Sequence, residues 1–174
     1  LFKFRSISGY VICRSGGPIS WKSIRQNRTS LSSCEAEIVA TSECMTELEH
    51  IRHRAVDLSL PEAQDRITVY NDNDACVQWS ASVTNKGTKH MNLKENYVRE
   101  AHQLGLAEVK HIPGIINTSD LFIKELKDGG HFRRCRDSMM VSRINFQKYG
   151  HVMPSHRQNK SDLPYYVLQR PVSS

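Results

Sequence analysis

The chain has 174 residues and a mass of 19.9 kDa, which fits one ordinary domain with some extra length. A hydrophobic content of 39% and a mean hydropathy of -0.51 describe a soluble globular protein and exclude the membrane-embedded and low-complexity classes. The net charge of +6 is uneven, because residues 1–128 contain 16 Lys and Arg against 16 Asp and Glu, whereas residues 129–174 contain 8 against 2. We therefore predict a domain over residues 1–128 and a basic C-terminal tail over residues 129–174 that is partly ordered at best.

The first 31 residues predict strands. Tyr10, Val11 and Ile12 favour β structure, so residues 8–13 are expected to form a strand. A Gly-Gly-Pro turn follows, and Ile19 and Trp21 then alternate with polar neighbours, which predicts a second strand paired with the first as a hairpin. A third strand is expected over residues 29–31.

A long amphipathic helix is predicted next. Ser32 and Glu35 form a capping box, in which each side chain satisfies a backbone N–H that is free at the helix start. Apolar residues then recur at helical spacing as far as Leu58, and Pro61 marks the exit from the helix.

The remainder alternates between predicted strands and helices. Residues 67–70 are expected to form a strand, followed by helices over residues 75–79 and 92–103 and by a last strand over residues 107–112. Thr118 is expected to cap a short helix, which Gly129-Gly130 terminates. This order favours an α/β fold in which helices flank a mixed sheet.

Three carboxylates, Glu37, Asp72 and Asp120, each lie where a helix is expected to begin. Taken singly, each has a structural explanation: the helix macrodipole favours Glu37 and Asp120 in a first turn, and Asp72 would serve as an N-cap. Active sites of open α/β sheets form beyond the carboxyl ends of strands, where Asp72 is expected. Acids gathered there would need cations, and Mg²⁺ prefers oxygen ligands, so the three residues together predict a metal-dependent site for phosphoryl transfer.

Seven short segments stand out along the chain. They are RSISGY at 5–10, GPISWKS at 17–23, LSSCEAE at 31–37, YNDN at 70–73, TKH at 88–90, VRE at 98–100 and NTSDLF at 117–122. These segments resemble the ribonuclease H domain of copia-type retrotransposon polyproteins, and they keep the family's order and approximate spacing from about residue 5 to residue 127.

The resemblance implies a ribonuclease H-like fold and cleavage of the RNA strand of RNA–DNA hybrids during reverse transcription. It implies two Mg²⁺ ions, with Mn²⁺ as an alternative, and a catalytic set of four carboxylates. Glu37 matches the helix glutamate of that set, with Glu35 as the less favoured neighbour, and Asp72 and Asp120 match two of the aspartates. The implied partners are the hybrid and the upstream reverse transcriptase segment of the same polyprotein. The substrate-binding candidates are Asn73, Lys89, His90 and Trp21.

The chain also departs from the family's pattern. The family's first aspartate lies on an opening strand upstream of the segment at residues 5–10, and residues 1–34 contain no Asp or Glu. We therefore expect the first strand to be missing or incomplete, and the isolated chain to show little or no cleavage. Asn92 and Asn96 stand where the family typically has Asp and His. The alternative is a catalytically inactive remnant that binds nucleic acid or serves as a structural domain.

Cysteine spacing, histidine positions and the composition of the tail bear on location and binding. The five cysteines are irregularly spaced and no signal peptide is present, which predicts an intracellular protein of the cytoplasm or nucleus without a membrane partner. His50 and His53 share a helix face, for which a solvated surface is favoured over a metal site. The basic residues and tyrosines of the tail could contact nucleic acid, although a solvated tail is the favoured interpretation.

Overall fold

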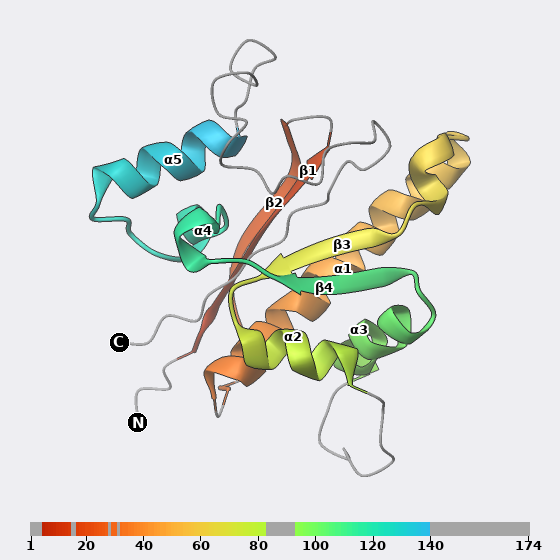
Figure 1. The fold of residues 1–174 in the computed structure, drawn as a ribbon, viewed down its shortest axis with the longest axis horizontal. Helices are drawn as coiled ribbons and strands as arrows, with labels where there is room; N and C mark the ends of the chain where they lie inside the picture. The colour runs from red at the N-terminus through yellow and green to blue at the C-terminus, as the bar shows by residue number, and fades with distance from the viewer. Residues whose placement is uncertain (1–4, 15–16, 28, 31, 83–92, 140–174) are drawn as a thin grey trace.

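The computed structural model describes residues 5–14, 17–27, 29–30, 32–82 and 93–139 (Figure 1). Its elements in chain order are β1 (Ile7–Arg14), β2 (Gly17–Arg25), α1 (Ser33–Asp57), the 3-10 helix η1 (Pro61–Gln64), β3 (Ile67–Asn71), α2 (Asp74–Ala81), α3 (Leu93–Gln103), β4 (Ala107–His111), the 3-10 helix η2 (Gly114–Ile116), α4 (Asp120–Ile123) and α5 (Gly129–Met139). The predicted α/β class is confirmed.

The first two strands form the predicted hairpin. They pair in antiparallel fashion with Val11 opposite Trp21, and a bulge shifts the register after Ile12. The third predicted strand is wrong at its described positions, because residues 29 and 30 have no strand structure. Ser30 instead turns its hydroxyl back to donate a hydrogen bond to Gln26 Oε1 at 3.0 Å.

The other two strands, β3 and β4, pair in parallel with Val69 opposite Val109. Among the described residues, the strands therefore form two two-stranded sheets, where we predicted a single mixed sheet. No described strand pairs with both β1 and β3, so backbone hydrogen bonds do not join the two sheets within this part of the chain. The ribonuclease H-like topology stays a prediction.

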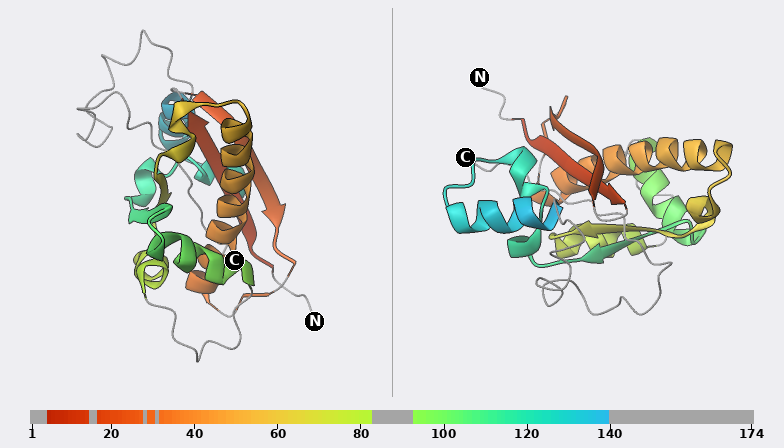
Figure 2. Two further views of the ribbon diagram at one scale, coloured as in Figure 1. Left: turned by 90° about the vertical axis from the view of Figure 1, so that its right-hand side faces the viewer. Right: turned by 90° about the horizontal axis from the view of Figure 1, so that it is seen from above.

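Helix α1 runs alongside both sheets (Figure 2). Side-chain packing against α1 joins the two sheets. Ser32 Oγ accepts a hydrogen bond from the backbone N–H of Glu35 at 3.1 Å, which confirms the predicted helix start. The inner face of α1 then packs with residues of both sheets and of α3 in one apolar core. The largest members of this core are Tyr10, Ile12, Met45, Leu48, Ile67, Val69, Val98 and Val109.

Helix α4 packs against the face of β1 that points away from α1. Gly9 permits this approach, since a Cβ atom built there would lie 2.4 Å from Cγ2 of Ile123. The cap of α4 is Ser119 and not the predicted Thr118. Gly129-Gly130 was expected to terminate a helix, but it begins α5, whose Cys135 and Met139 are buried. The predicted boundary between domain and tail at residue 128 stays a prediction.

Within the described ranges, no helix combines the length and apolar character needed to span a lipid bilayer.

Candidate functional site

Glu37 lies on the second turn of α1 and is buried, with 1% of its surface exposed. Asn71, the last residue of β3, donates a hydrogen bond from Nδ2 to Glu37 Oε2 at 3.2 Å and to Thr41 Oγ1 at 3.3 Å. The first-turn acid of α1 is Glu35, so the macrodipole explanation fits Glu35 better than Glu37. The Asn71 side chain thus ties the glutamate of α1 to the carboxyl end of a parallel strand.

Asp72 follows β3 directly, and Asn73 caps the next helix. Asn73 Oδ1 accepts a hydrogen bond from the Cys76 backbone N–H at 3.1 Å, so the N-cap role expected for Asp72 belongs to Asn73. The Asn73 backbone N–H in turn donates to Asn71 Oδ1 at 2.7 Å. Gly114, after β4, lies close to the Asp72 carboxylate, since a Cβ atom built on Gly114 would lie 3.0 Å from Asp72 Oδ2.

The negative charges of Glu37 and Asp72 both affect the pKa of the buried Cys76 thiol. Burial raises its pKa to about 12, a hydrogen bond with Thr41 opposes this shift, and the negative charges of Glu37 and Asp72 add to it. The charge of Glu37 likewise adds to the effect of burial in raising the pKa of Cys34. Glu37 and Asp72 therefore lie within electrostatic range of one side chain, at the end of β3.

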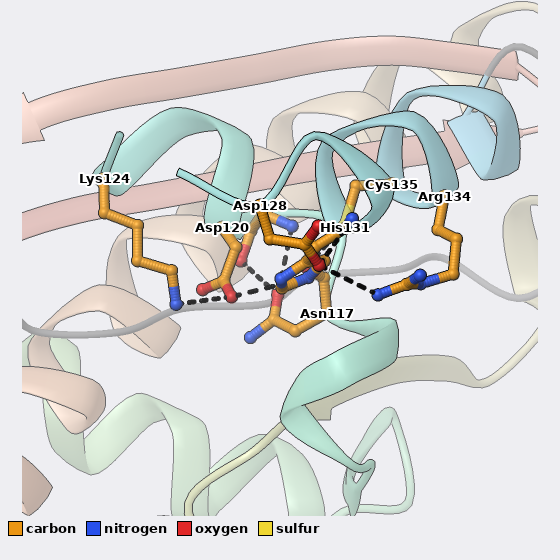
Figure 3. Close-up of polar contacts among 8 residues, drawn as sticks. Asn117, Asp120, Lys124, Asp128, His131, Arg134 and Cys135 are labelled. Atoms are coloured by element: carbon orange, nitrogen blue, oxygen red, sulfur yellow. Dashed lines mark hydrogen bonds and ion pairs between the residues drawn. The ribbon is translucent and has the colours of Figure 1, made fainter. Parts of the chain in front are cut away.

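Asp120 begins α4 and is also 1% exposed, in a cluster drawn from α4 and α5 (Figure 3). Its Oδ2 atom lies 2.6 Å from Lys124 Nζ and 3.9 Å from His131 Nε2. Its Oδ1 atom is buried and has no hydrogen-bond partner among the described residues. The carboxylate thus has one cation beside it and one unused acceptor oxygen.

The turn before Asp120 is fixed by Asn117. Asn117 Oδ1 accepts hydrogen bonds from the Ser119 backbone N–H at 3.0 Å and from Ser119 Oγ at 2.7 Å. Cys135 of α5 donates from Sγ to the Asn117 carbonyl at 3.5 Å, which anchors α5 on this turn. Burial raises the pKa of Cys135 to about 11, and the charge of Asp120 adds to the shift.

The structure brings two of the three predicted ligands into one neighbourhood. Over the described ranges, no group of three or more His, Cys, Asp or Glu side chains is placed to hold one metal ion. The assignment of Glu37, Asp72 and Asp120 as metal ligands and catalytic residues stays a prediction.

The predicted substrate-binding residues are spread over the fold. Trp21 lies on β2 with 59% of its surface exposed, and Asn73 is the cap of α2. Lys89 and His90 lie outside the described residues, as does Asn92. Asn96 is on α3, where its Oδ1 atom is buried without a hydrogen-bond partner in the described part of the chain.

His50 and His53 are both exposed on α1, and His53 Nε2 lies 3.2 Å from Glu49 Oε1. The interpretation of this pair as a solvated helix face agrees with that exposure.

Sequence reasoning missed Asn71, Lys124 and His131. Lys124 had a signal, because it follows Asp120 by four residues, a spacing at which opposite charges meet on a helix. Asn71 adjoins Asp72 at the strand end, but the side of the sheet to which the Asn71 side chain points depends on the pairing of β3 with β4. His131 had no signal, since it reaches Asp120 only through the turn between α4 and α5.

The chain is similar to segments of known polyproteins, three of them from plants. The chain is 31% identical over 121 residues to the retrovirus-related Pol polyprotein from transposon TNT 1-94 of Nicotiana tabacum. It is 28% and 26% identical over 122 residues to those from transposons RE2 and RE1 of Arabidopsis thaliana. The alignments cover 69–70% of this chain, which spans only 8–9% of the length of these relatives.

No protein-family model matches the chain, and no solved structure matches it significantly. The similarity supports a common origin with retrotransposon Pol polyproteins, so the predicted relationship is confirmed at that level. The finer assignment to the ribonuclease H region stays a prediction.

Proposed function

We propose that this chain is the ribonuclease H-type segment of a retroelement Pol polyprotein, and that it acts there on the RNA strand of RNA–DNA hybrids. The observation that carries the proposal is the hydrogen bond between Asn71 and Glu37, at 3.2 Å. It places a buried glutamate beside the strand end from which Asp72 emerges, at the edge of a parallel pair where α/β enzymes bind their ligands.

The donor set fits Mg²⁺, because carboxylate oxygens are the ligands that this ion prefers. Asp120 Oδ1 is a buried acceptor without a hydrogen-bond partner in the described residues, which a cation would satisfy. Glu37, Asp72 and Asp120 would hold the ions. When bound, Mg²⁺ supplies a Lewis acid that stabilises the charge of the phosphate and lowers the pKa of a bound water.

The chain's own residues would orient this site and keep its charge balanced. Asn71 holds the Glu37 carboxylate, and the cap of Asn73 on α2 fixes the backbone that follows Asp72. Cys76 stays protonated at neutral pH because its pKa is about 12, so it adds no further negative charge beside the two acids. Each of these contacts reduces the number of arrangements that the acids can adopt.

The contact between Lys124 and Asp120 favours a second candidate function, nucleic-acid binding without hydrolysis. The ammonium group at 2.6 Å already neutralises the carboxylate that would otherwise attract a metal ion. In this case the domain would hold the hybrid for another segment of the polyprotein, and its acids would serve stability alone.

A cleavage assay on a labelled RNA strand in an RNA–DNA hybrid separates the two functions. The proposal expects Mg²⁺-dependent cleavage when the chain is joined to the reverse transcriptase segment of its polyprotein, and loss of that cleavage in Asp72→Asn. The matched control is Asp57→Asn, at an exposed acid that ends α1. Equal cleavage by the wild type and Asp72→Asn would overturn the proposal.

The isolated chain provides the second arm of the assay. We expect it to show little or no cleavage but to bind the hybrid. Robust cleavage that Asp72→Asn abolishes would show that three carboxylates suffice. Binding without cleavage in both arms would favour the second candidate function.

A further inference from the structure

The outward side of β2 presents three exposed residues in alternation, Trp21, Ser23 and Arg25, which we call the β2 outer face. Side chains of a strand alternate between two sides, and Ser20 marks the opposite side, since its hydroxyl donates to Glu47 of α1 at 3.0 Å. The β2 outer face therefore points away from α1 and the apolar core.

The large aromatic residue of this face is open to solvent. Trp21 is 59% exposed, and Ile19, at the bulge of the same strand, is 46% exposed. Single exposed apolar residues are common on protein surfaces, but an exposed tryptophan offers a broad flat ring that partners bind. Exposure alone does not identify the partner.

The charge of this region of the chain favours an anionic partner. Residues 1–34 contain six Lys and Arg and no Asp or Glu. Arg25 lies on the same side as Trp21, and Arg5 is exposed beside the hairpin. Neither arginine forms an ion pair within the described ranges, so their charges are available to an anion. The surface thus combines an open aromatic ring with uncompensated positive charge.

We propose that the β2 outer face binds single-stranded nucleic acid, with Trp21 stacking on a base and Arg25 contacting the phosphate backbone. Unpaired bases present the free rings that stacking requires, whereas bases in a duplex stack on one another. The face carries no acidic side chain that would repel the backbone. The interaction needs no metal ion and no hydrolysis, so it does not depend on the proposed function of the carboxylates.

The test measures binding of a short fluorescent oligothymidylate to the full chain in EDTA. We expect Trp21→Ala to weaken binding roughly tenfold, in line with the loss of one stacked base, and Trp21→Phe to retain most of the affinity. Leu58→Ala removes an apolar side chain that is 71% exposed at the end of α1, and it is the matched control that should bind as the wild type does. Arg25→Gln should flatten the dependence of log K on log salt by about 0.7, the value for one phosphate contact.

Tryptophan fluorescence gives a second readout of the same complex. Oligothymidylate should quench the emission of the wild type, and much of this quenching should disappear in Trp21→Phe, because the remaining Trp79 packs under Arg99 at 4.1 Å. Circular dichroism of each variant should match the wild type, since Trp21 is exposed.

Three results would overturn the proposal: no binding by the wild type, equal affinity of the wild type and Trp21→Ala, or loss of self-association in Trp21→Ala without change in oligonucleotide affinity. The last result would assign the face to a protein interface. Because the binding assay contains EDTA and measures no cleavage, failure of the carboxylate site and failure of this surface are distinguishable.

Discussion

Lys124 Nζ lies 2.6 Å from Asp120 Oδ2, so a buried carboxylate at the start of α4 receives its cation from the residue that caps the end of the same short helix. The two residues are four apart, and the lysine is the more exposed partner. The pair explains how an acid can be 1% exposed at the start of α4 without a cation from outside the chain.

Replacement of Lys124 should therefore destabilise the fold. In Lys124→Met the Asp120 carboxylate remains buried without its nearest cation, and we expect the free energy of unfolding to fall by about 2 kcal/mol. Urea unfolding followed by circular dichroism measures this change. Arg134→Met is the control, because its pair with Asp128 at 3.6 Å is exposed on both sides and should contribute less than about 0.5 kcal/mol. Adding Asp120→Asn to Lys124→Met should restore part of the stability, and a double variant no more stable than Lys124→Met would contradict this account.

Asn71 should matter more for stability than an ordinary surface asparagine. Asn71→Ala removes the amide that bonds Glu37 and Thr41, two buried groups, and we expect a loss of about 1–3 kcal/mol. Asn27→Ala, at an exposed position, should change the free energy of unfolding little. Chemical unfolding of both variants decides the matter, and equal stability would show that the Asn71 bonds contribute nothing.

Gly9 should not tolerate a side chain. In Gly9→Ala the new methyl group would meet Ile123 Cγ2 at 2.4 Å and Phe122 Cβ at 3.1 Å, so α4 must shift from β1. We expect a loss of about 1–3 kcal/mol in the free energy of unfolding. Gly17→Ala is the matched control, since nothing lies within 4 Å of a Cβ atom built there. The comparison of the two thermal midpoints tests the packing of α4, and similar midpoints would place α4 elsewhere.

Glu108 should make stability depend on pH below its ordinary pKa. Partial burial raises the pKa of Glu108, but hydrogen bonds from Lys110 and Thr68 and the charge of Arg66 outweigh this effect, so the pKa lies below its usual range. The folded state then binds fewer protons than the unfolded state, so this contribution is fully present above about pH 4.3 and is lost as the pH falls through the folded pKa.

Thermal unfolding between acidic and neutral pH tests the direction in which the contribution of Glu108 to stability changes with pH. Glu108→Gln should be less stable than the wild type at pH 7, and the difference should shrink at acidic pH. Glu125→Gln, at an exposed acid, should show no such trend. A difference that grows on acidification would reverse the assigned direction of the shift.

Local signals in the sequence predicted most elements, because they depend on neighbouring residues. Ser32 caps α1 as its spacing to Glu35 indicated, and the paired strands β1 and β2 follow from β-favouring residues around a turn. A local capping signal also precedes α5, but it did not enter the prediction. Asp128 accepts hydrogen bonds from the backbone N–H groups of Gly130 at 2.8 Å and His131 at 3.1 Å, which is the cap that begins this helix.

Features that depend on distant pairing were not predictable from local patterns. The choice of Asn73 over Asp72 as the cap of α2 depends on where β3 stops pairing with β4, at Asn71 opposite His111. The sequence predicted the chain positions of Glu37, Asp72 and Asp120, and the structure shows what surrounds each one. It did not predict that Lys124 and His131 would surround Asp120, since the approach of α5 is a tertiary contact.

The contact between Gly9 and Ile123 also bears on the order in which the fold assembles. The two residues are 114 positions apart (123 minus 9) yet lie in direct contact. During synthesis β1 leaves the ribosome long before α4, so the face of β1 that packs against α4 stays uncovered until α4 has been made. Contacts of such long sequence separation also form slowly. Asp120, at the start of α4, is also the last of the three acids to be synthesised, and a chain that ends before residue 123 lacks the helix that packs on Gly9.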